Sequence, residues 1–213
     1  MIKAVIFDLD GVLIDSEKYH HASFNYALKE LGLKLKISDF RKLFGTGALS
    51  IIDGIFYKNG IKKDALPYVR KKDDAYRKLI KGKLKTIPGA KELLIKLSRK
   101  YKIALASSTA LENLNMIIKK IGIEKYLDYY ISGATLKQTK PNPEIFLKCA
   151  SALKVKNKEC VVIEDAKAGI EAAKSAGMKC IGVAFTLPKS YLKEADLIVD
   201  KIADISLDMI KAL

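Results

Sequence analysis

Residues 3–12 of the chain read Lys3-Ala4-Val5-Ile6-Phe7-Asp8-Leu9-Asp10-Gly11-Val12. The apolar run over residues 3–7 is nearly continuous, which is typical of a strand buried on both faces of a parallel sheet. Two carboxylates follow it, spaced two residues apart. In open α/β sheets, ligands bind at the carboxyl ends of the strands. This stretch therefore predicts an α/β fold with an acidic site at the end of its first strand.

Three further apolar runs have the length of strands, at residues 102–106, 160–163 and 179–184. Helical patterns lie between them, at residues 110–121, 143–153 and 166–176, and glycines follow the first and last of these. Strands that alternate with helices indicate a parallel sheet covered on both faces. We therefore predict a doubly wound, Rossmann-like α/β core.

Residues 16–83 differ because they show helical periodicity without an intervening strand. Helices are expected at about residues 22–31, 38–44, 48–58 and 64–81. The stretch thus reads as an all-helical cap domain, residues 16–83, inserted into a core domain made of residues 1–15 and 84–213. Lys81-Gly82-Lys83 is a candidate hinge between the two.

Composition indicates an ordinary globular protein, with 49% hydrophobic and 30% charged residues. No apolar window is long enough to span a bilayer, and the first apolar run is too short for a signal peptide. We expect a cytoplasmic protein without a membrane partner, monomeric by default at this size. The three cysteines are too widely spaced for a metal or redox pair, so free buried thiols are expected.

The formal net charge of +15 raises the question of a nucleic-acid partner. The lysines are scattered over expected helix surfaces and turns rather than clustered. A solvated lysine-rich surface that attracts anionic substrates accounts for this pattern, and a nucleic-acid partner is not favoured.

A second acid pair, Glu164-Asp165, follows the third apolar run. Four acids at one sheet edge would repel each other unless a cation lay among them. Ligands that are all oxygen suit Mg²⁺. Capping of the helix that follows is the alternative role for this pair.

Two more polar groups follow apolar runs. Ser107, Ser108 and Thr109 come where a helix is expected to begin, either as an anion site or as a simple cap. Lys140 lies in Thr139-Lys140-Pro141-Asn142-Pro143, whose prolines fix the loop. A rigidly placed ammonium suits developing phosphoryl charge.

Taken in order, these four motifs resemble those of the haloacid dehalogenase superfamily: Asp8-x-Asp10-Gly11-Val12, Ser107, Lys140-Pro141-x-Pro143 and Glu164-Asp165. The resemblance implies that Asp8 attacks phosphorus to give an aspartyl phosphate, while Asp10 acts as general acid and then base. It also implies that Ser107 and Lys140 bind the transferring phosphoryl group. Mg²⁺ would be held by Asp8, the backbone carbonyl of Asp10, Asp165 and Glu164.

The first motif with Asp15-Ser16 after it, the helical insertion and the stretch from Glu164 to Ala173 look like the β-phosphoglucomutase subgroup and its sugar-phosphatase relatives. In the mutases, a histidine at the place of His20 helps to couple cap closure to proton transfer, although packing is an equal alternative. Ser108, Thr46 and Lys72 are further candidates for contacts to the substrate.

Two departures from the mutase pattern decide between reactions. The cap loop Gly45-Thr46-Gly47-Ala48-Leu49-Ser50 lacks the arginine that grips a second phosphate, and Ala110-Leu111 replace a Lys-Asn pair. We therefore favour an Mg²⁺-dependent phosphatase for small phosphorylated metabolites, with sugar phosphates first. A β-phosphoglucomutase is the alternative, and a basic nucleic-acid-binding or scaffold protein on the same fold is the third.

Overall fold

The computed structural model describes residues 1–213 and contains a six-stranded parallel sheet in the order β5-β4-β1-β6-β7-β8. Its strands are β1 (Ala4–Phe7), β4 (Lys102–Ser107), β5 (Tyr129–Ser132), β6 (Cys160–Glu164), β7 (Lys179–Val183) and β8 (Leu197–Val199). From β1 the chain first adds β4 and β5 on one side of the sheet, and then β6, β7 and β8 on the other side. β1 is thus the point where the winding reverses, and ligands bind at such a point in α/β sheets.

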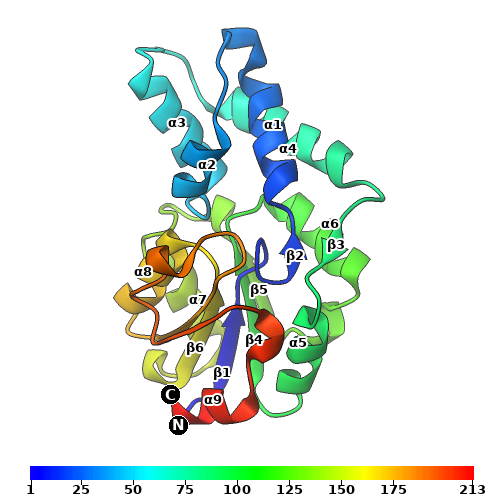
Figure 1. The fold of residues 1–213 in the computed structure, drawn as a ribbon, viewed down its shortest axis with the longest axis vertical. Helices are drawn as coiled ribbons and strands as arrows, with labels where there is room; N and C mark the ends of the chain where they lie inside the picture. Colours follow the sequence, from blue (N-terminus) through cyan, green and yellow to red (C-terminus); the bar gives the residue numbers. More distant parts are fainter.

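Helices cover both faces of this sheet (Figure 1). Alternate strand residues face opposite sides, so Phe7, Leu105 and Ile163 belong to one core cluster and Ile6, Ala104 and Val162 to the other. α5 (Ala90–Ser98), α6 (Leu111–Ile121) and α9 (Leu207–Ala212) contribute to the first cluster, whereas α7 (Glu144–Leu153) and α8 (Lys167–Ser175) contribute to the second. The predicted doubly wound α/β core is confirmed.

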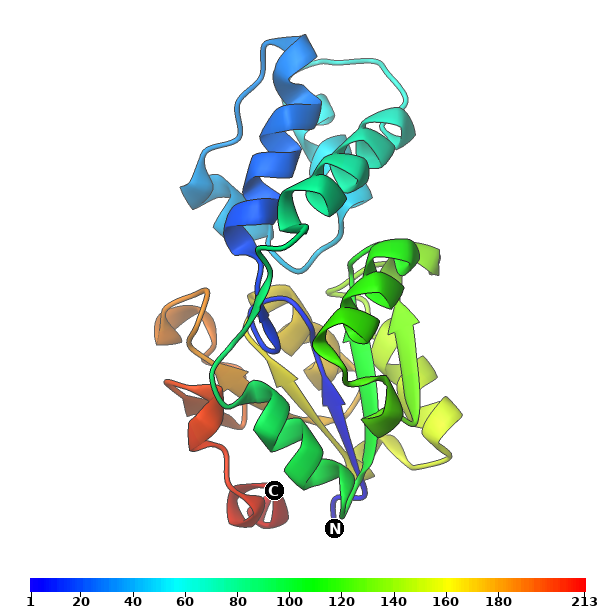
Figure 2. The same cartoon turned by 90° about the vertical axis from the view of Figure 1, so that its right-hand side faces the viewer.

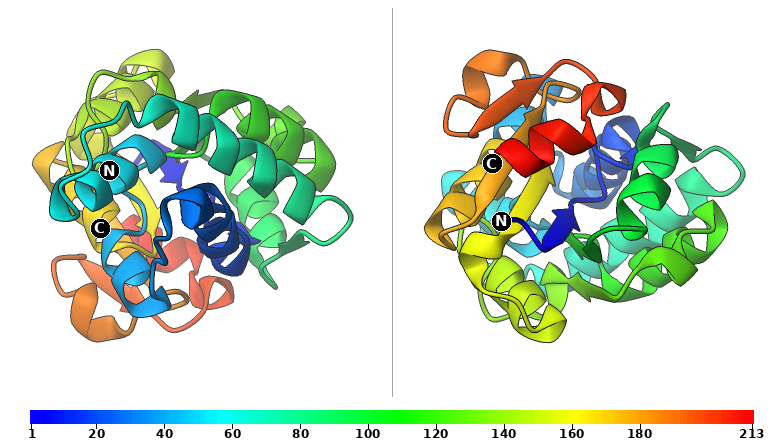
Figure 3. Two further views of the ribbon diagram at one scale, coloured as in Figure 1. Left: turned by 90° about the horizontal axis from the view of Figure 1, so that it is seen from above. Right: turned by 90° about the horizontal axis from the view of Figure 1, so that it is seen from below.

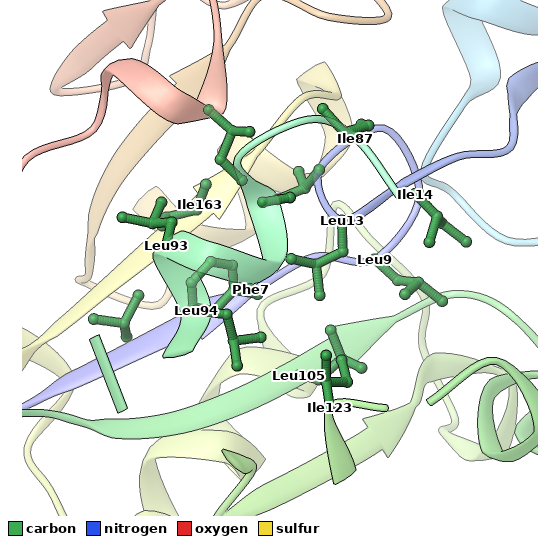
Figure 4. Close-up of a cluster of buried hydrophobic side chains, with 14 of the residues drawn as sticks. Phe7, Leu9, Leu13, Ile14, Ile87, Leu93, Leu94, Leu105, Ile123 and Ile163 are labelled. Atoms are coloured by element: carbon green, nitrogen blue, oxygen red, sulfur yellow. The ribbon is translucent and has the colours of Figure 1, made fainter. Parts of the chain in front are cut away.

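The loop that carries the first acid pair is anchored in the first of these clusters (Figure 4). Leu9, Leu13 and Ile14 are buried together with Leu94 of α5. Leu9 therefore points into the core between the two acids, which leaves the backbone around Asp8 and Asp10 little freedom to move.

Helices α1 (Glu17–Leu28), α2 (Ile37–Leu43), α3 (Ala48–Lys58) and α4 (Leu66–Ile80) lie beyond the carboxyl edge of the sheet (Figures 1 and 2). They surround a separate apolar cluster that includes Phe24, Phe40, Phe56 and Tyr68. Seen from above, they cover the end of the sheet (Figure 3). The four expected helices are thus present, α1 being extended by a 3-10 turn at Lys29–Leu31 that ends at Gly32.

Two short strands join this helical layer to the sheet. β2 (Ile14–Asp15) pairs antiparallel with β3 (Lys85–Thr86), so the outgoing and returning connections run side by side (Figure 2). Gly82 precedes β3 with a positive φ of 74°. The domain boundaries at residues 15/16 and 83/84, and the hinge, stay predictions.

The sequence patterns predicted four of the six strands in the main sheet. β5 was not predicted because it is an edge strand of sequence Tyr-Tyr-Ile-Ser whose two tyrosines are only half-buried. β8 was not predicted because it has three residues at the opposite edge. No helix of the structure is both long and apolar enough to cross a membrane. All three cysteines are free and buried, as expected.

Candidate active site

Asp8 follows β1 directly and forms an ion pair with Lys140. The Nζ atom of Lys140 lies 2.6 Å from Asp8 Oδ1 and 2.7 Å from Glu164 Oε1. The lysine side chain is only 1% exposed, and its ammonium also lies over the ring of Phe146. A buried ammonium is stable here because two carboxylates face it. These three residues come from three segments that the sheet brings to one edge.

Glu164, at the end of β6, uses both of its oxygens. Oε1 accepts from Lys140, and Oε2 accepts from the backbone N–H groups of Asp165 and Ala166 at 2.8 Å each. A Cβ atom on Gly169 would lie 1.7 Å from Oε1, so only glycine leaves room for this carboxylate on α8. Glu164 thus fixes the turn that leads into α8 and is the second partner of Lys140.

Asp165 is a buried carboxylate that lacks a hydrogen-bond partner. Neither of its carboxylate oxygens accepts a hydrogen bond, and the neighbouring Thr186 hydroxyl also has no partner. Asp8, Glu164 and Asp165 can each place an oxygen within 4.8 Å of the others. Burial, together with the charges of Glu164 and Asp8, raises the pKa of Asp165 well above its ordinary value.

These features fit a divalent cation bound by oxygen ligands. A cation would supply the missing partner of Asp165 and would remove the repulsion among the acids. Gly11 keeps this space open, because at its φ of 80° a Cβ atom would lie 1.7 Å from Asp165 Oδ2. Any side chain at residue 11 would therefore fill the space beside the carboxylate.

Asp10 directs its carboxylate away from this cluster. Oδ1 accepts from the Ser16 hydroxyl at 2.6 Å and lies 2.9 Å from His20 Nε2. Oδ2 accepts from the Thr109 hydroxyl at 2.8 Å and from Ser107 at 3.3 Å. Burial raises the pKa of Asp10, but the charge of His20 and the hydrogen bonds outweigh it and bring the pKa below its ordinary value.

His20 and Tyr76 link the helical layer to Asp10. The two rings stack with centroids 3.9 Å apart and an angle of 11° between their planes. Burial lowers the pKa of His20, against the opposing effect of Asp10. Tyr76 is fully buried and belongs to α4, whereas His20 belongs to α1. The stack therefore fixes the imidazole that faces Asp10.

Lys72 is a buried cation of the helical layer. It is only 3% exposed, and its Nζ lies 3.0 Å from Asp73 Oδ1 and over the rings of Phe24 and Tyr76. Its position on α4 places it across the pocket from the sheet edge.

A pocket lies between the two layers and is called the reaction pocket below. Acids, one imidazole, one ammonium and an apolar wall line it: Asp8, Asp10, His20, Phe24, Phe40, Phe44, Gly45, Gly47, Ala48, Ile51, Lys72, Ser108, Thr109 and Asp165. A small molecule in this pocket meets carboxylates on one side and aromatic rings on the other.

Burial also raises the pKa of Asp8, and the charges of Glu164 and Asp10 act in the same direction, while Lys140 opposes them. Burial has the larger effect, so the pKa of Asp8 is raised to about 8. Lys140 favours the ionised carboxylate that a nucleophile needs, and a cation beside Asp165 would add to this effect.

Family comparison agrees with this arrangement of acids. The sequence model described as haloacid dehalogenase-like hydrolase matches residues 5–183. The chain belongs to this family.

Relatives of known name include both mutases and phosphatases. β-Phosphoglucomutase of Bacillus subtilis is 33% identical, over 98% of this chain and 94% of that protein. Phosphorylated carbohydrates phosphatase of Thermotoga maritima is 32% identical, over 87% of each. The chain also matches Protein SUPPRESSOR OF QUENCHING 1, chloroplastic, of Arabidopsis thaliana at 34% identity, spanning 97% of this chain and only 20% of that protein.

The fold is that of a solved member. The crystal structure of β-phosphoglucomutase from Clostridium difficile superposes with a TM-score of 0.89 at 31% identity, covering 100% of this chain and 96% of that one. The fold class and family expected from the four motifs are confirmed.

The structure brings most of the predicted site residues of this haloacid dehalogenase-like hydrolase together. Asp8, Asp10, Asp165, Ser108, His20 and Lys72 line the reaction pocket. Lys140, Glu164 and Ser107 are buried directly behind it. Thr46 lies outside the lining, and its hydroxyl donates to the carbonyl of Leu43 at the end of α2. The role of each residue stays a prediction.

Sequence reasoning missed three residues of this site, Ser16, Tyr76 and Thr186, and it did not foresee that Thr109 donates to Asp10. Ser16 and Thr109 donate to Asp10, Tyr76 stacks on His20, and Thr186 lies beside Asp165. Among the three missed residues only Thr186 carried a signal, because it is a hydroxyl residue just beyond a predicted strand at the active edge.

Proposed function

We propose that this chain is an Mg²⁺-dependent phosphatase that hydrolyses small phosphorylated sugars through an aspartyl phosphate, the acyl phosphate of Asp8. The observation that carries the proposal is the position of Asp8. Its carboxylate lines the reaction pocket, one oxygen is held by Lys140, and the orphaned carboxylate of Asp165 lies beside it.

The first step is attack of an Asp8 oxygen on phosphorus. The bond from phosphorus to the ester oxygen breaks, and the leaving oxygen takes a proton from the Asp10–His20 pair. Water then attacks phosphorus of the aspartyl phosphate, gives its proton back to that pair and releases phosphate and free Asp8. The short contact between Asp10 and His20 suits this exchange, because the proton has two sites on one buried pair.

Asp8 and Asp165 would hold Mg²⁺, with the backbone carbonyl of Asp10 as a further ligand. Bound there, the ion supplies positive charge to the oxygens of the transferring phosphoryl group. The carboxylate of Glu164 already accepts from Lys140 and from two backbone N–H groups. We therefore assign Glu164 to holding Lys140 rather than to direct ligation.

The protein's own residues would do the remaining work. Lys140 neutralises Asp8 and sets the direction of its free oxygen. The apolar wall of the pocket, with Phe24, Phe44 and Ile51, excludes water from the ester during attack.

A β-phosphoglucomutase is the second candidate, because the relatives include that enzyme at 33% identity. It would need a group that grips the second phosphate of a bisphosphate intermediate. The two segments where such groups are expected, the loop of residues 45–50 and the pair Ala110-Leu111, contain no basic residue. Hydrolysis is therefore the function that this site supports better.

The test is phosphate release from a panel of sugar phosphates, polyol phosphates and nucleotides, with Mg²⁺ and with a chelator. Release that requires Mg²⁺ and disappears in Asp8→Asn is expected. If nothing is hydrolysed and a hexose 1-phosphate is instead converted to its 6-phosphate in the presence of bisphosphate, the mutase is the right function. A cytoplasmic location and a monomeric state remain predictions.

A further inference from the structure

The amino ends of the parallel strands form the edge of the sheet that is opposite to the reaction pocket (Figures 1 and 3). β4, β1 and β6 are neighbours in the sheet, so the segments that precede them, residues 99–102, 1–3 and 154–159, lie side by side. Ala4 is the register partner of both Lys102 and Cys160. Because neighbouring strands are about 4.8 Å apart, these three rows lie within about 10 Å.

The three segments are rich in exposed cations. We call this set the basic edge, and each of its members is exposed: Lys3, Arg99, Lys100, Lys102, Lys154, Lys156 and Lys158. The same segments contain one acid, Glu159, whereas the whole chain has 39 basic residues for 24 acids. In the sequence these cations are spread from residue 3 to residue 158, and the parallel sheet brings them together. The lysines that were expected to be scattered are thus clustered at this edge.

Contacts within the basic edge hold its centre in place. Lys3 pairs with Glu159 at 2.7 Å. The ammonium of Lys102 donates to the carbonyl of Leu153 at 2.7 Å, which ties the start of β4 to the end of α7. No carboxylate oxygen lies within 4.0 Å of the charged groups of the other five cations: Arg99, Lys100, Lys154, Lys156 and Lys158.

The edge stays positive when the acids beside it are counted in full. Asp128 precedes β5, and its carboxylate accepts from a backbone N–H of β4 at 2.7 Å. With Glu159 and Asp128 both counted, the seven cations leave a net charge of +5. On the other side, Lys174 and Lys179 share Asp196, so β7 adds no excess of negative charge.

Stabilisation of helix ends accounts for only part of this charge. Arg99 and Lys154 are the C-cap residues of α5 and α7, where the helix dipole favours a cation. Lys100, Lys156 and Lys158 lie beyond those caps. Like charges on adjacent rows repel each other, and a polyanion bound across them would remove that repulsion.

The residues of the edge favour a phosphate backbone over other large anions. Peripheral binding to an anionic membrane is strengthened by apolar side chains that insert into it, and Met1 is the one large exposed apolar residue of these segments. Tyr101, their one aromatic residue, packs against the core, so no ring is free to stack on an unpaired base. A duplex presents stacked bases and outward phosphates. One of its strands has a phosphate about every 3.4 Å along the axis, so the three rows alone match about three phosphates.

We propose that the basic edge binds the phosphate backbone of a nucleic-acid duplex without reading its sequence. The inference does not depend on the proposed function, because the basic edge and the reaction pocket lie at opposite ends of the same strands. A duplex and a small substrate can therefore be bound at the same time.

Fluorescence anisotropy measures this binding with a labelled DNA duplex and a labelled RNA duplex of about 20 base pairs. Neither has a terminal phosphate, so the reaction pocket has no monoester to bind. Four to five phosphate contacts predict that log K falls with log salt concentration at a slope of about −4, or about 250-fold between about 50 and 200 mM salt. The dissociation constant should be about 1–100 μM at physiological salt.

Substitutions separate the basic edge from the net charge of the chain. A variant that combines Arg99→Gln, Lys100→Gln, Lys156→Gln and Lys158→Gln should bind at least about ten-fold more weakly, with a slope near about −1. The matched control removes four exposed cations of the helical layer, by Lys34→Gln, Lys36→Gln, Lys58→Gln and Lys62→Gln. It has the same net charge and should change the affinity by less than about two-fold.

The edge variant should keep its circular dichroism spectrum and its rate of phosphate release. If it unfolds instead, the single variants Lys100→Gln and Lys158→Gln replace it, and each should make the slope less steep by about 1.

Absence of binding to both duplexes at about 50 mM salt would overturn the inference. An equal loss of affinity in the control variant would also overturn it, because net charge rather than the edge would then bind the duplex. Tighter binding to vesicles of phosphatidylserine and phosphatidylcholine than to either duplex would make the edge a membrane surface instead. Binding of only one of the two duplexes would support the inference and identify the kind of nucleic acid.

Discussion

Lys140 Nζ lies 2.7 Å from Glu164 Oε1, and both side chains are buried. This contact connects the Lys140 loop to the end of β6 and gives the ammonium a second carboxylate beside Asp8. The charges of Asp8 and Glu164 raise the pKa of Lys140, although its burial alone lowers it. The site is therefore held together by buried charges. Removing any one of them leaves its partner buried and unpaired.

Glu164→Gln should lower the free energy of unfolding by about 3 kcal/mol, because the substitution removes one member of a buried ion pair. Urea denaturation at pH 7 measures the loss. Asp200→Asn removes the exposed pair with Lys189 and should change the same quantity by less than about 0.5 kcal/mol. A loss at residue 164 no larger than that of the control would show that Lys140 does not depend on Glu164.

Gly169→Ala should destabilise the protein by about 1–3 kcal/mol, because its Cβ atom would collide with Glu164 Oε1. Intrinsic helix propensity acts in the opposite direction, by about 1 kcal/mol in favour of alanine. Gly54→Ala in α3 is the matched control, since a Cβ atom there meets nothing within 4 Å. Thermal unfolding should show a lower midpoint temperature for Gly169→Ala and an unchanged or higher one for Gly54→Ala. Similar shifts for the two variants would refute the predicted collision with Glu164.

Tyr76→Leu should reduce the rate of phosphate release by about five-fold, because a stacked aromatic pair contributes about 1 kcal/mol to the position of His20. Tyr76→Phe keeps the stack and removes only a hydroxyl that has no partner, so it should retain most of the activity. Steady-state kinetics of the two variants decide between stacking and the hydroxyl. A large loss in the phenylalanine variant would assign the role to the hydroxyl instead.

Asp196 should make stability depend on pH far from the active site. Burial raises its pKa, but Lys174, the N–H of Cys180 and Lys179 together bring it below its ordinary value. A lowered pKa in the folded state stabilises the protein above the unfolded value of about 3.9, and this contribution is lost as pH falls through the folded value. Asp196→Asn should therefore cost about 1–3 kcal/mol at pH 7 and progressively less below about pH 4. A difference independent of pH would contradict this account.

The core of the sheet was predictable because β1, β4, β6 and β7 are buried on both faces and read as apolar runs. The polar residues that end them, Asp8, Ser107 and Glu164, were predictable for the same reason, since parallel strands deliver their carboxyl ends to one edge. Edge strands lack this signal, because one side of β5 or β8 has no neighbour and the burial is incomplete.

The part of the site that depends on the helical layer could not be predicted. Tyr76 is one aromatic residue in an amphipathic helix, and its stack on His20 requires the packing of α4 on α1. Nothing in the spacing of Ser16 and Thr109 shows that both donate to Asp10, because they come from segments far apart in the chain. The placement of Asp53 and Asp73 in one pocket likewise follows only from the packing of α3 and α4 over the core.

The most direct test of the central claim is chemical trapping of the intermediate on Asp8. The enzyme is mixed with Mg²⁺ and a sugar phosphate labelled in its phosphate group, quenched in acid, digested and analysed by mass spectrometry. We predict a hydroxylamine-sensitive phosphate on the peptide that contains Asp8, absent from Asp8→Asn and absent with a chelator. Turnover with the label on another residue, or undiminished turnover by Asp8→Asn, would contradict the account.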